Sequence, residues 1–582
     1  MILQQLESYY VRLAEAGDDT LVVPGFSLQN VTFRINLNPD GTLVNISDAR
    51  SLTAKKPVAQ KMQLLGSSKP SGQKINPCFL WDNTAYALGF KLGDEKPERT
   101  REAFNAFRER HLAVQNEIED PEFDAVCSFL KTWDPARASE FPILEELSTG
   151  FGVFHVVGCV KDVHQNAKVL GWWKRQLAIK VEGDSDECRM QCLVTGELSK
   201  TARIHEPKIK GVNGAQPAGA LLVSFNLGAA ESYGREQSFV APVSEEAAFR
   251  YAVALNKLLD GANKQRIQIG DATSVFWTAK PTPIEQALPG LVDLASVEDE
   301  ELKARLSSIL TKLSQGKRVE ELGPLDTDFF VLGLSPNAAR VSVRFWWRGT
   351  IGEIAEKLGK HFSDLQIAMP PGGSQFPSFW QILRETSREA KDIPPILSGG
   401  LLRSILVGTE YPAILFQSLM RRLKADREIP PIRAAAIKAY LNRSFRSGNR
   451  QTPLKSELQM ALNPDRPEPS YQLGRLFAVL EKTQSDAFKG SLNATIKDRF
   501  FSAASATPAT VFPRLIRLNQ HHSSKLETKS YQVNAEKRMQ EIMAKLESFP
   551  AHLSMAEQGL FAIGYYHQRQ DFFTKKEDPS NE

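Results

Sequence analysis

Residues 393–408 read IPPILSGGLLRSILVG, and the character of the chain changes at this stretch. Its two adjacent prolines end the preceding segment, because a proline fixes its own φ and disfavours the α region for the residue before it. Apolar residues at helical spacing follow, and from Pro394 onward the sequence reads as helices punctuated by prolines. We therefore place a domain boundary here, between residues 1–392 and residues 393–582.

The second part is basic. Residues 393–582 hold 27 Lys and Arg and 18 Asp and Glu, a net charge of +9, whereas the whole chain of 582 residues carries +4. Residues 1–392 therefore carry −5. A basic helical module joined to a mildly acidic body indicates a protein that holds a polyanion. Helices are expected at 398–408, 411–426, 431–446, 471–488, 491–500, 511–522, 531–547 and 555–572.

The first part is rich in strands. Apolar residues at 31, 33, 35 and 37 alternate with polar ones, and Asn38-Pro39-Asp40-Gly41 supplies the residues of a tight turn. These residues and the apolar 43–46 predict a β-hairpin. Further strands are expected near 153–160, 221–225, 274–277, 329–334 and 341–347, and helices at 2–16, 97–118, 244–259 and 294–315. The predicted fold class is α+β: a strand-rich mixed body, with room for two subdomains, followed by an all-α C-terminal helical bundle.

The bulk composition is that of a soluble globular protein, with 42% hydrophobic and 24% charged residues. The five cysteines are scattered and odd in number, which does not match a disulfide framework and favours a reducing compartment. The first residues lack the continuous apolar run of a signal peptide, and no segment is apolar enough to span a bilayer. A cytoplasmic protein without membrane contact is predicted.

Signatures of catalysis are missing from the sequence. It contains no GxxxxGK[ST], HExxH or GxSxG motif. His521 and His522 are neighbours and would point in different directions on a helix, and Cys188 and Cys192 lack the second ligand pair of a structural zinc site. We expect no catalytic residue, no metal and no cofactor. The alternative is a metal-dependent nuclease that uses acidic residues such as Asp271 and Asp498.

Two polar, basic, glycine-rich loops stand out in the first part, at 66–77 and 208–219. Small residues let a backbone approach a groove, lysines contact phosphate, and amides pair with base edges. The alternative is a pair of ordinary surface loops, which composition alone favours. The candidate contacts to duplex DNA are Lys69, Ser71, Gln73, Lys74, Asn76, Lys208, Lys210, Asn213 and Gln216.

Basic residues also recur along the predicted helices of the second part. Such a face is commonly only solvated, but an excess spread over several helices favours a surface that follows phosphates. The candidate contacts to single-stranded DNA are Arg421, Arg422, Lys424, Arg427, Arg514 and Arg517, and Arg433, Lys438, Arg443, Arg446 and Arg450 continue the series.

Specific motifs are spread along the whole chain: NPDGTLVNISDAR, FLWDNTAYALG, SFNLGAAESYG, APVSEEAAFRYAVALN, IGDATSVFW, LGLSPNAARVSVRFWW, IPPILSGGLLRSILVGTEYP, IRAAAIKAYLNR, YQLGRLFAVLEKTQSDA, ATIKDRFFSAASATPATVFPRL and FPAHLSMAEQGLFAIGYYHQRQ. Taken together, these motifs resemble the large subunit of the type I-C CRISPR surveillance complex, Cascade, essentially from end to end.

The resemblance implies a non-catalytic subunit of an RNA-guided complex. Such a subunit senses a short duplex motif beside the target, the PAM, helps to separate the strands and form the R-loop, and helps to recruit the helicase–nuclease. The implied partners are the guide RNA, target double-stranded DNA, and the backbone, guide-processing and small subunits. On this view the two loops contact the PAM side, and the basic helices hold the displaced single strand.

The resemblance also implies that the small subunit can be made by internal initiation within the same gene. Met460 is the first candidate start, because a proline-rich break and a new helix follow it. Residues 460–582 would then form an independent helical bundle. Met420 is the weaker candidate, because a start there would fall inside a predicted helix.

Overall fold

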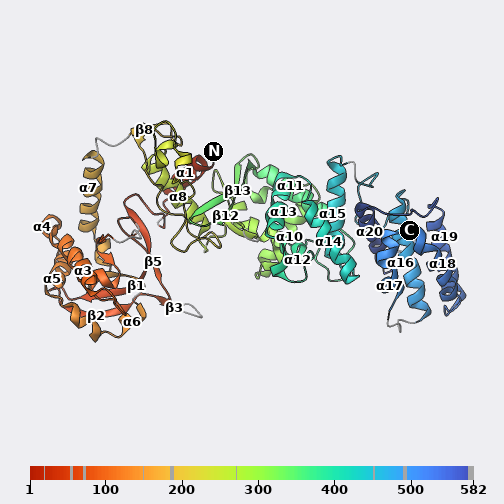
Figure 1. The fold of residues 1–582 in the computed structure, drawn as a ribbon, viewed down its shortest axis with the longest axis horizontal. Coiled ribbons are helices and arrows are strands. Elements are labelled where there is room, and N and C mark those ends of the chain that lie inside the picture. Colours follow the sequence, from red (N-terminus) through yellow and green to blue (C-terminus); the bar gives the residue numbers. More distant parts are fainter. Residues whose placement is uncertain are drawn as a thin grey trace. The chain divides into compact units, whose positions relative to one another are not determined.

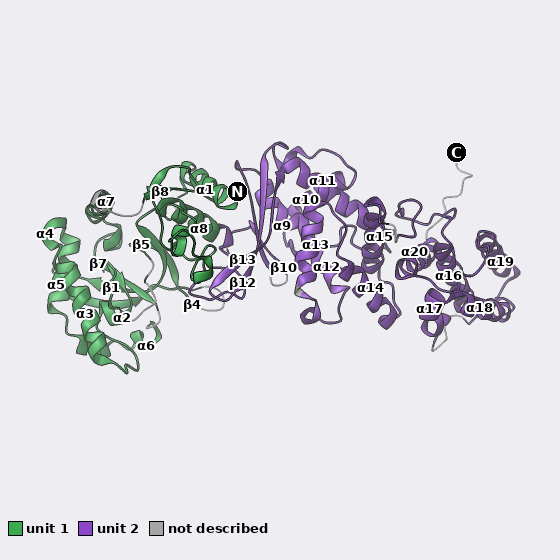
Figure 2. Cartoon of the chain, turned by 45° about the horizontal axis from the view of Figure 1, so that its top comes forward, with its two compact units in different colours: residues 1–209, 221–257 green, residues 210–220, 258–582 purple. Residues whose placement is uncertain are grey.

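The computed structural model describes residues 1–18, 20–52, 57–67, 69, 74–147, 150–183, 189–261, 263–269, 272–449, 452–488 and 494–573. The chain divides into two compact units (Figure 2): the first holds residues 1–209 and 221–257, and the second holds residues 210–220 and 258–582. The expected boundary at 393 does not coincide with this division, because one apolar core contains buried residues from both sides of it, such as Leu358 and Leu401.

The sheet of the first unit has the strand order β2-β1-β7-β6, and β5 pairs with the N-terminal half of β1. The strands are β1 Phe26–Leu37, β2 Leu43–Asp48, β5 Gln60–Leu65, β6 Trp81–Asp82 and β7 Phe151–Val156. Figure 1 shows β1, β2 and β5 together in this unit. The predicted hairpin is confirmed, with Ile35 opposite Ile46. The strand expected at 153–160 begins at Phe151 instead and ends at Val156.

The helices of this unit are α1 Ile2–Glu15, α2 Thr84–Ala87, α3 Pro97–Leu112, α4 Gln115–Ile118, α5 Pro121–Thr132, α6 Ile143–Leu147, α7 Ala167–Gly183 and α8 Glu245–Leu259. Helices α2 to α7 contribute buried residues to a core that they share with the sheet, and α1 contacts α8 through the rings of Tyr10 and Phe249. The buried aromatic residues include Phe33, Phe79, Phe107, Phe123, Phe129 and Phe154. The helix expected at 97–118 is interrupted between α3 and α4. Two small hairpins complete the strands, β3 Ser51–Leu52 with β4 Pro57–Val58 and β8 Arg189–Gln191 with β9 Leu198–Lys200.

The strand predicted at residues 221–225 is wrong. These residues are irregular and half-buried, and they form no ladder with another described strand. An apolar run favours an extended conformation, but a strand also needs a neighbour for its backbone hydrogen bonds, and sequence does not supply that neighbour.

The second unit begins with an antiparallel sheet in the order β10-β11-β12-β13. Its strands are β10 Arg266–Ile269, β11 Ala272–Thr278, β12 Asp328–Asn337 and β13 Arg340–Thr350, which confirms the strands expected at 274–277, 329–334 and 341–347. The helices that follow or interrupt them are α9 Ile284–Val292, α10 Glu300–Ser314, α11 Ile351–Leu365, α12 Phe379–Arg384 and α13 Pro395–Val407. Helices α9, α11 and α13 contact the sheet.

The remaining chain is helical, as predicted, although the helix expected at 491–500 begins at Ile496 and ends at Ala506. The helices are α14 Ala413–Asp426, α15 Pro431–Arg446, α16 Pro469–Ala487, α17 Ile496–Ala506, α18 Pro508–Ser523, α19 Lys529–Met543 and α20 Met555–Asp571. Helix α16 packs on α17, α18, α19 and α20, while α20 also contacts α15. With strands concentrated before residue 351 and helices after it, the α+β fold class is confirmed.

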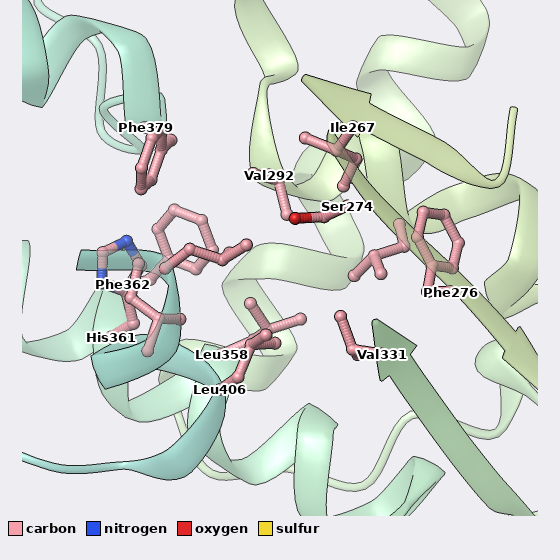
Figure 3. Close-up of a pocket in the computed structure, with 13 residues that line it drawn as sticks. Ile267, Ser274, Phe276, Val292, Val331, Leu358, His361, Phe362, Phe379 and Leu406 are labelled. Carbon is pink, nitrogen blue, oxygen red and sulfur yellow. The ribbon is translucent and has the colours of Figure 1, made fainter. Parts of the chain in front are cut away.

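An internal cavity lies between the second sheet and α11, α12 and α13 (Figure 3). Its volume is about 20 Å³, and apolar side chains such as Phe276 and Leu358 make up most of the wall. The buried hydroxyl of Ser274 is among the lining groups, and His361 Nδ1 lies 2.6 Å from the Tyr411 hydroxyl. A space of this size holds one water-sized molecule and is too small for a substrate.

Candidate nucleic-acid interface

The first basic loop is anchored to the core by the residue that was expected to reach DNA. The ammonium of Lys69 forms an ion pair with Asp82 and lies 3.2 Å from the centroid of the Tyr86 ring. The Lys69 side chain is 14% exposed and the Asp82 side chain is fully buried. The role of Lys69 as a DNA contact stays a prediction, but its charge already has a partner within the fold.

The motif around Asp82 explains this anchor. Asp82 ends β6 and accepts hydrogen bonds from the backbone N–H groups of Cys78, at 2.9 Å, and Asn83, at 2.7 Å. Asn83 in turn caps α2 through its side-chain oxygen. Burial raises the pKa of Asp82 and lowers the pKa of Lys69, while the opposite charge of each partner offsets part of this effect.

Among the candidate contacts of this loop that the structure describes, Lys74 and Asn76 are exposed. Ser71 and Gln73 lie outside the described residues. The solvent-facing candidates that the structure places here are therefore Lys74 and Asn76.

Replacing Lys69 with methionine is expected to lower the free energy of unfolding of the first unit by about 2 kcal/mol, because it leaves the buried Asp82 carboxylate without its counter-ion. The raised pKa of Asp82 limits the cost, since the carboxyl can take up a proton instead. Urea unfolding followed by tryptophan fluorescence measures the change. Lys74→Met serves as the matched control and is expected to stay within about 0.5 kcal/mol; equal effects of the two substitutions would contradict the anchoring role.

The second basic loop is held by its backbone and turns its polar side chains outward. Ile209, Val212 and Ala220 are buried, whereas Lys210, Asn213 and Gln216 are exposed. The N–H of residue 213 donates to Thr273 Oγ1 at 3.1 Å. Residues 210–220 belong to the second unit, and the 66–77 loop belongs to the first.

Lys208 precedes this exposed part of the loop. Its side chain is half-buried, and its carbonyl oxygen accepts a hydrogen bond from Asn256 at 3.0 Å. Gly211 adopts a φ of +88°, and a Cβ there would lie 2.8 Å from the carbonyl oxygen of Leu259. A side chain at this position would be strained and would clash, so glycine is required.

The basic residues of α14 differ in whether their side chains form ion pairs or hydrogen bonds within the protein. Lys424 is exposed, and Arg421 is exposed and donates a 3.1 Å hydrogen bond to Ser418 Oγ. Arg422 pairs with Asp426 one turn later, at 2.7 Å. Arg427 ends the helix in the left-handed region and donates to the carbonyl oxygen of Asp498 at 2.6 Å.

Helix α17 contacts both groups of predicted basic residues, the one on α14 and the one on α18. Arg427 reaches its first turn, and on its next turn the Phe500 ring lies 5.3 Å from the guanidinium carbon of Arg514. Arg514 and Arg517 are exposed on α18, one turn apart. Sequence reasoning missed Arg499, which is exposed on α17 between the clusters. The basic track, as we name it, consists of Arg421, Lys424, Arg427, Arg499, Arg514 and Arg517.

Helix α15 carries basic residues that do not join this track. Arg433 is 3% exposed and pairs with Glu385 and Asp426, and Arg443 is 5% exposed and pairs with Asp364. Lys438 is buried and donates to the carbonyl oxygen of Asp364. These cationic groups therefore have partners inside the protein and are not exposed to a nucleic-acid strand. The spacing of basic residues in the sequence did not reveal this. Arg450 lies outside the described residues.

Met460 lies in the segment between α15 and α16. Its side chain is 53% exposed, and its carbonyl oxygen accepts a hydrogen bond from the Ala368 N–H at 2.9 Å. The residues after it contain α16 to α20, which share a core of aromatic side chains including Phe477, Phe501 and Phe561. Internal initiation of translation at Met460 stays a prediction.

Within the ranges that the structure describes, no three or more His, Cys, Asp or Glu side chains gather as ligands for a metal ion. Asp498 is used at the start of α17, where its carboxylate accepts a hydrogen bond from the N–H of Thr495 at 2.7 Å. Asp271 and Cys188 fall outside these ranges. None of the helices in the described part of the chain is long and apolar enough to cross a membrane.

Comparison with known proteins gives the family. No curated protein matches the chain. The model of a CRISPR-associated protein family, Cas_Csd1, matches residues 6–573, which is nearly the entire sequence. The resemblance on which the sequence analysis relied is thereby confirmed. The chain belongs to the Cas_Csd1 family of CRISPR-associated proteins, the large subunit of the type I-C Cascade complex.

Proposed function

We propose that this chain is a non-catalytic subunit that recognises the PAM in double-stranded DNA, assists strand separation and R-loop formation, and helps to recruit the helicase–nuclease. The observation that carries the proposal is the basic track, whose cations lie exposed on α14, α17 and α18. A strand held by charge along such a surface needs no sequence-specific contacts, since pairing with the guide RNA supplies specificity.

The duplex side of the proposal rests on the two basic loops. Lys74, Asn76, Lys210, Asn213 and Gln216 are the exposed candidates. Their amides can contact base edges and their lysines phosphates. Backbone anchoring of 210–220 to β11 supports this role, because a fixed loop loses little conformational entropy on binding.

Replacing Arg514 and Arg517 with glutamine in the assembled complex is expected to weaken binding of target DNA about 10-fold to 30-fold at 0.1 M salt. Each lost phosphate contact to a single strand reduces the slope of log K against log salt by about 0.7, so the slope should fall by about 1.4. A filter-binding titration at several salt concentrations gives both quantities.

The control for this experiment is Lys303→Gln with Arg305→Gln on α10, which removes the same charge outside the track. An equal loss of affinity in the control, or a loss confined to one PAM sequence, would contradict the proposed division between loops and track. Cleavage of DNA by the purified chain with a divalent metal would contradict the non-catalytic role.

The internal start has its own test. Replacing Met460 with leucine is expected to remove a shorter product that carries the C-terminus, while the full-length chain persists. An immunoblot against a C-terminal tag detects both products. Met420→Leu is the matched control, and a short band that survives Met460→Leu but disappears with Met420→Leu would move the start to α14.

A further inference from the structure

A polar hollow of about 580 Å³ opens on the first sheet, where β1 lies between β5 and β7. Figure 1 shows β1 and β5 side by side in this unit. The lining side chains come from these three strands and from the turn after β7: Arg34, Asn36, Gln60, Lys61, Met62, Gln63, His155, Val160, Asp162 and Gln165. The volume falls in the range of about 300–1,000 Å³ that is typical of sites for small organic ligands.

The alternation of β1 explains why this face is polar. Phe33, Ile35 and Leu37 point into the core and are fully buried, so Arg34 and Asn36 point to the opposite face. Asn36 is held there by hydrogen bonds from its amide nitrogen to Asn45 Oδ1 at 2.6 Å and Ser47 Oγ at 2.9 Å. The alternation of side chains along β1 therefore places Arg34 and Asn36 in the wall of the hollow.

A buried carboxylate fixes the arginine of this hollow. Arg34 Nε donates to both oxygens of Asp162, at 3.0 and 3.3 Å, and the Asp162 side chain is 6% exposed. His155 Nδ1 lies 3.3 Å from the same carboxylate. Nε is engaged by this carboxylate, and the terminal nitrogen Nη2 of Arg34 lies 3.5 Å from Gln60 Oε1. A guanidinium held in this way is preorganised to bind an anion.

The remaining wall supplies hydrogen-bonding groups rather than stacking surfaces. Four amides line it, from Asn36, Gln60, Gln63 and Gln165, and each can both donate and accept. Arg34 and Lys61 contribute two positive charges against the single carboxylate of Asp162. A ligand that fits carries at least one negative charge together with a polar, planar group, and a nucleotide has both.

We propose that this hollow seats one nucleotide of a single nucleic-acid strand, with its phosphate toward Arg34 and Lys61 and its base toward the amides. The inference rests on the proposed function, because it requires that the chain contacts strands in the assembled complex. It adds a site that lies on the first unit, separate in the fold from the basic track on the helices of the second.

Crosslinking from the rim of the hollow tests the proposal. Val160 lines the hollow and is 99% exposed, so a photoreactive benzophenone amino acid can replace it in the assembled complex. The guide RNA, the target strand and the displaced strand are labelled in three separate arms, which distinguishes the source of the nucleotide. Irradiation is expected to attach one labelled strand to the chain.

Charge reversal of a lining lysine then shows whether the crosslinked strand is bound in the hollow or only touches its rim. Lys61→Glu is expected to lower the yield of the adduct at least about tenfold. Lys161→Glu makes the same charge change on an exposed residue that does not line the hollow and is expected to lower it less than about twofold. Lys61 is chosen over Arg34, because loss of Arg34 would leave Asp162 buried without its main partner.

Three results would overturn the site: no adduct, an adduct with another protein subunit only, or a strand adduct whose yield does not depend on Lys61. If the same complex still binds target DNA normally, the proposed function stands and only the hollow fails. Loss of target DNA binding in the parent complex would instead count against the proposed function.

Discussion

Replacing Gly474 with alanine is expected to lower the free energy of unfolding of the helical part by about 3 kcal/mol, although the same change stabilises most helices. Gly474 lies where α16 crosses α20. A Cβ at this position would lie 2.0 Å from the carbonyl oxygen of Phe561 and 2.8 Å from the N–H nitrogen of Tyr565. Both atoms belong to the backbone of α20, so the clash is relieved only if the helices move apart.

The crossing is close from both sides. A Cβ on Gly564 of α20 would lie 2.1 Å from the carbonyl oxygen of Tyr471 on α16. Separating the two helices would also disturb the contact of the Tyr471 hydroxyl with His567, at 2.9 Å. Since α16 contacts every other helix of this bundle, the loss at one crossing is expected to spread through its core.

Gly399 provides the matched control for this substitution. It lies in α13 with no atom near the position of a Cβ and without a positive φ. Gly399→Ala is therefore expected to raise the free energy of unfolding by about 0.5–1 kcal/mol through helix propensity. Thermal unfolding followed by circular dichroism compares the variants, and a stabilising Gly474→Ala would show that the two helices do not cross as described.

Replacing Asp364 with alanine is expected to lower the free energy of unfolding by about 3–5 kcal/mol, because it leaves the buried guanidinium of Arg443 without its counter-ion. Arg443 Nε lies 2.9 Å from Asp364 Oδ2, and Arg446 Nη2 lies 2.6 Å from the same oxygen. The side chains of Arg443 and Asp364 are 4% and 3% exposed. An arginine does not give up its proton in a protein, so its charge would remain in the interior.

A surface ion pair serves as the reference for Asp364. Glu389 pairs with Lys391, and both side chains are more than half exposed. Glu389→Ala is expected to change the free energy of unfolding by less than about 0.5 kcal/mol, as exposed pairs generally do. The two variants are compared by the midpoint of urea unfolding. A small effect of Asp364→Ala would show that the hydrogen bonds that Arg443 already donates to the carbonyl oxygens of Ser404 and Thr409 are enough to hold its charge.

These two expectations depend on contacts that no local pattern reveals. Arg443 and Arg421 are both basic residues on predicted helices of the same module, and spacing alone gives them the same role. The fold buries Arg443 against Asp364, 79 positions earlier in the chain, and leaves Arg421 at the surface. The same holds for Lys69 and Lys74, which lie in one polar loop but differ in whether a buried carboxylate reaches them.

The sequence by itself determined the family and most of the helices and strands that local patterns specify. Periodicity, proline breaks and turn residues specify the β1–β2 hairpin and the helices from α13 to α20, because local backbone preferences and the spacing of apolar residues act over a few positions. The motifs spread along the chain were specific enough to indicate the Cas_Csd1 family.

Tertiary structure alone decided which charged side chains are exposed, that α17 contacts basic residues of both α14 and α18, and that a polar hollow opens beside Arg34. These features depend on contacts between residues far apart in sequence, and a charge becomes a binding group or a buried ion pair according to the partner that the fold brings to it.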